Sequence, residues 1–134
     1  MMKRNSEDSA NRSALVVTSS GVAHFPIPGI ISYSSTKILV SRFCEAIAEE
    51  LRDKRIDVMS WEAGSITTNL NPSKGIFSLT CKTAVNGCFS KIGFESVSDG
   101  YWLHELMMVS SPLFSLTLFG SMIANGMRKA FIKK

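Results

Sequence analysis

Two short apolar runs on either side of one long uninterrupted segment constrain the fold of this chain most strongly. Residues 14–18 (ALVVT) and 56–61 (IDVMSW) have the length and composition of strands buried in a parallel sheet. Residues 34–55 contain no Gly or Pro and place apolar side chains, among them Phe43 and Ile47, at helical spacing. A strand, a helix and a second strand form a right-handed βαβ unit. We therefore predict an α/β fold with a parallel sheet.

The second half of the chain gives weaker signals. A loop at residues 72–75 precedes a predicted helix over 83–92, and Asp99-Gly100 is a turn signal before a predicted short strand over Tyr101–Leu103. Two or three strands are too few for a complete sheet, because a βαβ unit needs cover on both faces and neighbours at its edges. We expect residues 14–105 to be part of a larger, doubly wound, Rossmann-type sheet.

Composition excludes several classes of protein. The chain has 134 residues, of which 45% are hydrophobic, and this is enough for a packed core. Its net charge is +4, but the basic residues are spread along the chain, so we expect no nucleic-acid partner. Cys44, Cys81 and Cys88 are odd in number and lack CxxC spacing, which predicts reduced, mostly buried thiols and no metal site.

The carboxyl-terminal segment has the features of a membrane-adjacent region. Residues 106–127 carry no charge, and four lysines and arginines follow directly. Pro112, several serines and Asn125 lower the hydrophobicity, so a buried helix pair, an interfacial helix and a spanning helix all stay open. We predict an apolar helical extension over 106–134 that contacts a membrane surface or a partner chain. A small helical membrane protein is disfavoured by the two predicted strands.

Tyr33 and Lys37 form the first candidate for chemistry. They lie four residues apart at the start of the long predicted helix, so both side chains share one face. A phenol exchanges protons poorly at neutral pH unless a nearby cation or helix amino terminus stabilises the phenolate. Ser20 lies at the carboxyl end of the first strand, where parallel sheets bind ligands. Tyr33 and Lys37 alone would be interpreted as an exposed helix pair, and Ser20 alone as a turn serine. Their combination indicates a site.

The residues TSSG at 18–21 and YSSTK at 33–37 resemble the signature of short-chain dehydrogenase/reductases. The resemblance implies that Ser20 polarises a substrate carbonyl and that Tyr33 delivers the proton. It further implies that Lys37 supports Tyr33 and that both residues bind the cofactor, with Lys37 holding the nicotinamide ribose.

The loop after the second strand, EAGSITTNL, is similar to the Pro-Gly-x-Val-x-Thr segment of that family. The match implies that Gly64, Ile66 and Thr68 contact the nicotinamide end of the cofactor. Ala63 stands where the family has proline, which removes no group that the cofactor needs.

Residues 48–70 and 91–107 look like microsomal 3-oxoacyl-CoA reductases and related 17β-hydroxysteroid dehydrogenases. This resemblance implies NADPH-dependent reduction of a lipid ketone, such as a 3-oxoacyl-CoA or a steroid, at the endoplasmic reticulum membrane, with the catalytic part facing the cytosol. The implied partners are the lipid substrate, a membrane surface and another copy of the chain. Nothing in their spacing gives His24 or His104 a role, and we interpret Trp61 and Trp102 as packing residues.

The family's glycine-rich pyrophosphate turn does not occur in these 134 residues. The opening MMKR resembles the end of the helix before the serine-bearing strand. We therefore expect the carboxyl-terminal half of a reductase, in which residues 1–13 are a remnant of the preceding helix and loop and 14–105 are the catalytic half. By itself this half should bind NADPH weakly or not at all and be inactive. The alternative is a noncatalytic, membrane-associated interaction protein derived from such a reductase.

Overall fold

The predicted βαβ unit forms the centre of the computed structural model, which describes residues 12–72, 74–110, 121 and 124–126. Strand β1 (Ser13–Thr18), helix α2 (Ile31–Leu51) and strand β2 (Ile56–Trp61) follow one another, with the 3-10 helix η2 (Arg52–Lys54) closing the long helix. β1 and β2 pair in parallel from Ser13 opposite Ile56 to Thr18 opposite Trp61. These elements confirm the predicted unit, and α2 begins three residues before the predicted start.

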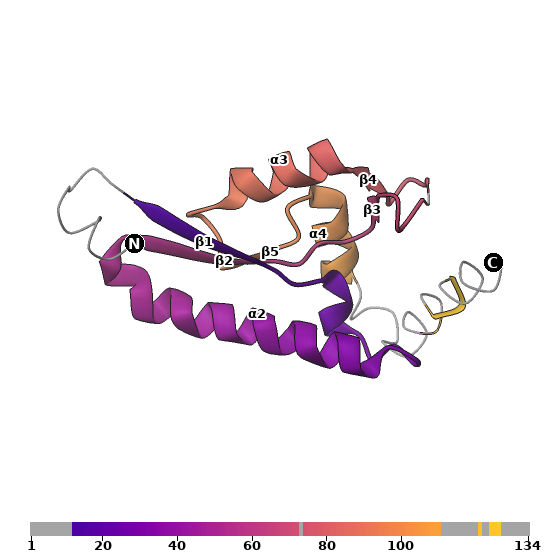
Figure 1. Ribbon diagram of the computed structural model, residues 1–134, viewed down its shortest axis with the longest axis horizontal. Helices are drawn as coiled ribbons and strands as arrows, with labels where there is room; N and C mark the ends of the chain where they lie inside the picture. The colour runs from indigo at the N-terminus through magenta and orange to yellow at the C-terminus, as the bar shows by residue number, and fades with distance from the viewer. Residues whose placement is uncertain (1–11, 73, 111–120, 122–123, 127–134) are drawn as a thin grey trace.

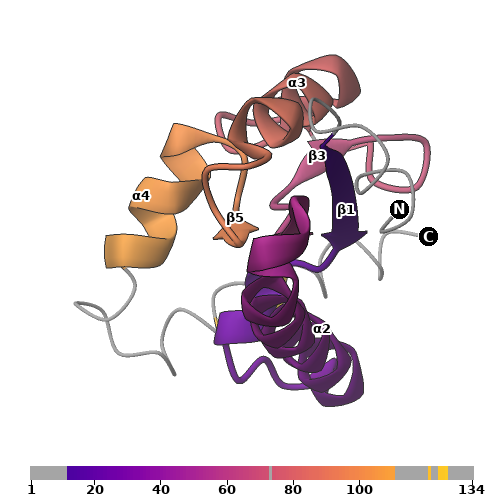
Figure 2. The same cartoon turned by 90° about the vertical axis from the view of Figure 1, so that its left-hand side faces the viewer.

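The sheet is completed by β5 (Val97–Ser98), which gives the order β1-β2-β5 with β2 in the centre. Figures 1 and 2 show α2 on one face of this sheet and the helix α3 (Cys81–Lys91) on the other, while α4 (Trp102–Ser110) lies beside the β5 edge. A second parallel pair, β3 (Ile66–Thr67) and β4 (Leu79–Thr80), lies beside the amino-terminal end of α3. The 3-10 helix η1 (Gly21–His24) connects β1 to the loop before α2. The described part is therefore a three-layered α/β arrangement.

The predicted strand over Tyr101–Leu103 is wrong. The strand lies earlier, at β5, and pairs with β2 only through Val97 and Ser98. Gly100 has a φ of 72°, a left-handed conformation that glycine adopts easily, and it turns the chain out of the sheet. The residues after it form α4, because no Gly or Pro interrupts them and apolar side chains recur at helical spacing.

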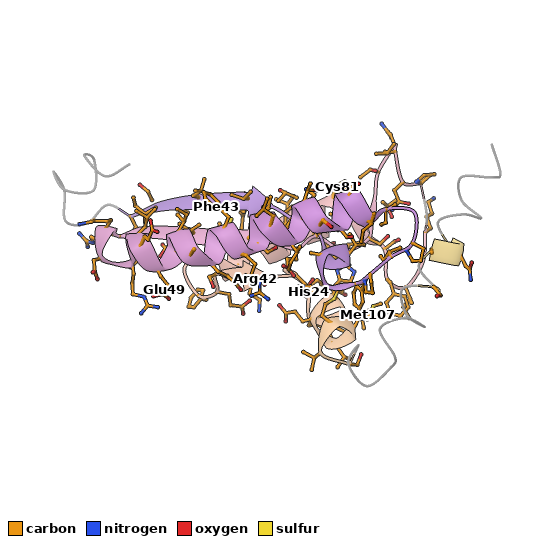
Figure 3. The ribbon with its side chains drawn as sticks, turned by 90° about the horizontal axis from the view of Figure 1, so that it is seen from below. His24, Arg42, Phe43, Glu49, Cys81 and Met107 are labelled. Atoms are coloured by element: carbon orange, nitrogen blue, oxygen red, sulfur yellow. The ribbon has the colours of Figure 1, made fainter. Side chains whose placement is uncertain are left out.

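Small and polar side chains occupy much of the buried face of α2. Ser34, Ser41 and Cys44 are its buried residues, whereas Phe43, one of the expected core positions, is 63% exposed. Figure 3 shows this solvent side of α2 with Phe43 labelled. The core contains Cys44, Ile56 and Val58, and the partly buried residues packed on it are Val17, Val40, Ile47, Ala48 and Leu51.

The predictions for cysteine and tryptophan are confirmed only in part. Cys44 and Cys88 are buried free thiols, and Cys81 is free but exposed. Trp61 is partly buried and its Nε1 donates a hydrogen bond to the Asp99 carbonyl at 3.2 Å. Trp102 is 63% exposed, so its interpretation as a packing residue is wrong for this structure. Nothing among the described His, Cys, Asp and Glu residues groups into a cluster that could hold a metal ion.

Most of the predicted apolar extension, like residues 1–11, lies outside the described residues. Its first residues, 106–110, belong to α4, which runs continuously across position 105. In the part of the chain that the structure describes, no helix has the length and hydropathy needed to cross a membrane.

Candidate active site at the carboxyl edge of the sheet

Three segments that carry candidate residues meet at one edge of the sheet. β1 ends at Thr18 and β2 ends at Trp61, and these two residues are register partners in parallel strands. The backbone pairing continues past both strands, because the Ser19 amide donates to the Trp61 carbonyl at 2.7 Å and the Gly21 amide to the Ala63 carbonyl at 3.3 Å. The amino-terminal end of α2 lies at the same edge (Figure 1). This is the edge where parallel sheets bind ligands.

Ser20 is held in an extended conformation between β1 and η1. Its backbone has φ −162° and ψ 143°, and it is the N-cap residue of η1, with its Oγ accepting from the Val22 amide at 3.4 Å. The same hydroxyl donates to the Ala63 carbonyl at 3.5 Å, and the residue is only 9% exposed. The side chain is thus turned toward the loop that follows β2, where a ligand carbonyl would compete with the Ala63 carbonyl for its proton.

Tyr33 and Lys37 are brought together as predicted. The Lys37 Nζ lies 5.6 Å from the centroid of the Tyr33 ring, and it donates to the Thr18 carbonyl at 3.0 Å. This hydrogen bond ties the lysine to the end of β1, two residues before Ser20. Tyr33 is 48% exposed, so its phenol ring is accessible from solvent. A cation over an aromatic ring is an attractive arrangement of about 0.5–1 kcal/mol at an exposed site.

The loop after β2 contains the three residues matched to cofactor contacts. Gly64 passes directly against the imidazole of His104, and a Cβ at this position would lie 2.5 Å from its Cε1 atom. Ile66 begins β3. The Thr68 hydroxyl accepts a hydrogen bond from the Asn71 amide at 3.0 Å, which leaves its own proton for a ligand. Thr68 also lines an open hollow of about 630 Å³ together with Thr67, Asn69, Pro72, Lys74 and Cys81.

A buried carboxylate that the sequence analysis did not single out lies between these segments. Glu62 follows β2 directly, is 2% exposed, and its Oε2 is 2.5 Å from the Nε2 of His24. Its Oε1 accepts from the Ser41 hydroxyl at 2.7 Å. Burial would raise the pKa of Glu62, but the hydrogen bonds from His24 and Ser41 outweigh it and hold the pKa below its ordinary value. The hydrogen bond to Glu62 raises the pKa of His24 in turn.

A second buried acid faces this pair. Asp99 follows β5, is 8% exposed, and its Oδ1 has no hydrogen-bond partner. Burial, and next the charge of Glu62, raise the pKa of Asp99 to about 7. The sequence contains only weak signs that Glu62 and Asp99 belong to a site, because an acidic residue directly after a buried strand has no diagnostic spacing. Their position after neighbouring strands, at the ligand-binding edge, was the one usable sign.

The model of the family described as short chain dehydrogenase matches residues 1–76. This match covers more than half of the chain and includes Ser20, Tyr33, Lys37 and the loop after β2. The chain belongs to the short-chain dehydrogenase family. The expectation drawn from the TSSG and YSSTK segments is therefore confirmed at the level of the family.

Curated relatives of this short-chain dehydrogenase include two very-long-chain 3-oxoacyl-CoA reductases. The protein from Macaca fascicularis is 32% identical over 99 residues, which are 72% of this chain and 32% of the relative. The protein from Bos taurus is 29% identical over 129 residues, which are 92% of this chain and 41% of the relative. The chain thus spans about a third to two fifths of the length of these relatives.

Solved structures confirm the fold. A structure from a study of 7β-hydroxysteroid dehydrogenase stereoselectivity superposes with a TM-score of 0.68 at 20% identity, covering 92% of this chain and 51% of the other. A short chain dehydrogenase from Burkholderia cenocepacia in complex with NADP gives a TM-score of 0.64 at 19% identity, covering 91% of this chain and 54% of the other. The Rossmann-type assignment of the sheet rests on these likenesses.

Proposed function

We propose that this short-chain dehydrogenase contributes the Ser-Tyr-Lys part of a site that reduces a ketone on a lipid substrate, such as a 3-oxoacyl-CoA or a steroid, with NADPH. The observation that carries the proposal is the placement of Lys37, whose ammonium contacts both the Tyr33 ring and the end of β1. Two neighbouring segments at the same edge carry Ser20 and the glycine loop. The names of the curated reductases support the acyl-CoA substrate class.

The residues present fit the nicotinamide end of the cofactor. The hollow beside the loop after β2 presents the hydroxyls of Thr67 and Thr68, the amide of Asn69 and the ammonium of Lys74, a donor set suited to a carboxamide and a phosphate. Gly64 and Ile66 would shape the loop, and Lys37 would hold the ribose hydroxyls. When bound, NADPH supplies the hydride that reduces the carbonyl carbon.

In the proposed reaction, each of the three residues has one task. The Ser20 hydroxyl donates a hydrogen bond to the substrate carbonyl oxygen, in place of the bond to the Ala63 carbonyl, and so stabilises the charge that develops on that oxygen. Tyr33 gives its phenolic proton to the same oxygen as the alcohol forms. Lys37 stabilises the negative charge left on the phenol oxygen. The reverse sequence oxidises the corresponding alcohol.

We further propose that the reaction takes place at the endoplasmic reticulum membrane, with the catalytic part facing the cytosol. The uncharged segment 106–127 and the four cations after it support this location. The full chain should float with vesicles containing anionic lipid, and a chain ending at residue 105 should not. Equal flotation of both chains would contradict the proposal.

A second candidate is a noncatalytic interaction protein that keeps the signature residues without using them. Large apolar side chains exposed on α2 and α3 favour it, namely Leu39 and Phe43 on the first helix and Val85 and Phe89 on the second.

Reduction assays distinguish the two candidates. The protein expressed with its upstream coding sequence should oxidise NADPH in the presence of a long-chain 3-oxoacyl-CoA or a steroid ketone, and the better of the two substrates identifies the class. Failure to reduce either substrate, in a protein that binds NADPH, would favour the noncatalytic candidate.

A further inference from the structure

A buried network of side chains connects the three segments of the candidate site. Its centre is the Ser41 hydroxyl, which lies 2.7 Å from Glu62 Oε1, 2.9 Å from the Ser19 hydroxyl and 3.1 Å from the Ser60 hydroxyl. Ser19 in turn donates to the Lys37 carbonyl at 2.8 Å. All four side chains of the network come from residues that are at most 2% exposed. The ends of β1 and β2 and the middle of α2 are therefore joined by one set of hydrogen bonds.

His24 extends this network to the segment that carries Ser20. His24 is the last residue of η1, and Ser20 is the N-cap of the same short helix. The helix touches the end of β2 at three points: the Gly21 amide and the Ser20 hydroxyl both donate to the Ala63 carbonyl, and His24 pairs with Glu62. Two of these contacts are single, weak hydrogen bonds of 3.3 and 3.5 Å. The ion pair is the strongest of the three.

We propose that the Glu62–His24 pair is a positioning device that sets the placement of Ser20, and that it acts through the charge on His24. The role of Ser20 as the carbonyl-binding group rests on the proposed function. With His24 protonated, the buried Glu62 carboxylate has a counterion and η1 is held against β2. With His24 neutral, the buried Glu62 carboxylate loses its counterion and keeps only neutral hydrogen-bond donors, and the contact that fixes η1 weakens.

Two charged residues act on the pair, and two more act on one of these. Asp99, after β5, favours the protonated histidine, and Arg42 of α2 opposes it. Arg42 also favours the ionised form of Glu62. Glu105 of α4 and Glu95, in the turn before β5, act on Asp99. Figure 3 shows His24 and Arg42 labelled on the same side of the molecule as Met107 of α4. Because the hydrogen bond to Glu62 raises the pKa of His24, the device stays engaged to a higher pH than an unperturbed histidine would allow, and it is released as the pH rises through the raised pKa.

The test is an NMR titration of the full chain that needs neither cofactor nor substrate. The His24 ring and the Gly21 and Val22 amides are followed from about pH 5 to about pH 9, around the unperturbed histidine value of about 6.5. We expect the His24 midpoint above that value and the two amides to shift with the same midpoint. In Glu62→Gln the midpoint should fall to the unperturbed value or below, and the amides should no longer follow it. Glu49→Gln is the matched control, because it removes a carboxylate from the exposed pair between Glu49 of α2 and Arg52 of η2, and it should change neither the His24 midpoint nor the amide shifts.

Hydrogen exchange provides a second test that does not need the Glu62 variant, in case that variant folds poorly. In His24→Gln the Gly21 amide, bonded to the Ala63 carbonyl, should exchange about tenfold faster, because its hydrogen bond opens more often. An unshifted His24 midpoint in Glu62→Gln, or Gly21 exchange unchanged in His24→Gln, would overturn the proposal. An upstream-extended protein that shows the expected titration and binds NADPH but never reduces a ketone would refute the proposed function and leave the coupling of His24 to η1 intact.

Discussion

At Gly64 a hydrogen atom in place of a side chain lets the loop after β2 pass against the imidazole of His104. That imidazole is 4% exposed and is fixed by a hydrogen bond between its Nε2 and the Phe77 carbonyl at 2.9 Å. The ring of Tyr101 packs against it edge-on, with 5.6 Å between the ring centroids. The conformation of one proposed cofactor-contacting residue therefore depends on a buried side chain of α4.

Gly64→Ala should destabilise the protein by about 1–3 kcal/mol, because the new methyl group overlaps the buried imidazole, which has little room to move. Urea unfolding measures the change. Gly75→Ala is the matched control, since a Cβ there meets no atom within 4 Å, and it should stay within about 0.5 kcal/mol of the parent or be slightly more stable. Equal stability of the two variants would contradict the packing described for Gly64.

The signature residues could be predicted from the sequence, and their supporting network could not. Tyr33 and Lys37 lie one turn apart on a helix, so their proximity follows from helical geometry alone. Glu62 and His24 are 38 residues apart, and their contact exists only because β1 and β2 are paired in a particular register. The burial of Ser41 on α2 is equally hidden, since serine at a helix surface is the ordinary expectation.

Among the elements, the turn between β5 and α4 is the one that buries an acid without a hydrogen-bond partner for its Oδ1 atom in the described residues. Its residue Asp99 is buried, and its Oδ1 would be only 3.7 Å from a Cβ placed on Gly21 of η1. Since the pKa of Asp99 is raised from 3.8 to about 7, the folded protein keeps a proton that the unfolded chain releases between these two values. Stability therefore falls as the pH rises from about 4 to about 7, by at most about 4 kcal/mol.

We predict that the free energy of unfolding in urea is lower at pH 8 than at pH 5, and that Asp99→Asn removes most of this difference. The raised pKa of His24 acts in the same direction, because the stability it adds is lost as the pH rises through its folded value. The pKa of Glu62 is lowered, so the stability that this carboxylate adds is lost only in acid, as the pH falls through its folded value. Asp53→Asn, in the exposed η2, is the control that should keep the full pH dependence. A flat pH profile in the parent protein would contradict the burial of an ionisable Asp99.

The long elements were predictable because their signals come from many residues. β1, α2 and β2 follow from two apolar runs and a segment without Gly or Pro. β3, β4 and β5 have two residues each, so no alternation of apolar and polar side chains can develop in them. Their pairing is decided by neighbours distant in sequence, which is also why a strand was predicted where α4 begins.

In the described sheet β1 forms one edge, and this strand is only partly covered. Leu15, in the centre of β1, is 39% exposed, although the composition of β1 is typical of a fully buried strand. The proposed cofactor contacts, Lys37, Gly64, Ile66 and Thr68, all lie at one end of the sheet, and the proposed function gives them only the nicotinamide end of the cofactor to hold.

We therefore expect the 134-residue chain alone to bind NADPH weakly or not at all, and the protein expressed with its upstream coding sequence to bind it well. Calorimetric titration of both proteins with NADPH makes the comparison directly. Micromolar binding by the 134-residue chain alone would contradict this expectation and would mean that its own residues also hold the phosphates.

Tyr33 is proposed to transfer the proton in ketone reduction, and the two tyrosines of the chain allow a matched test of this role. The measurement is the rate of NADPH-dependent reduction of a long-chain 3-oxoacyl-CoA by the upstream-extended protein and by its Tyr33→Phe and Tyr101→Phe variants. Removing the Tyr33 hydroxyl should lower the rate by about 100-fold or more, the usual contribution of a positioned general acid. Tyr101→Phe, which keeps the ring packed between Trp102 and His104, should retain a rate close to that of the parent. A Tyr33→Phe variant that reduces the substrate at the parent rate would contradict the account.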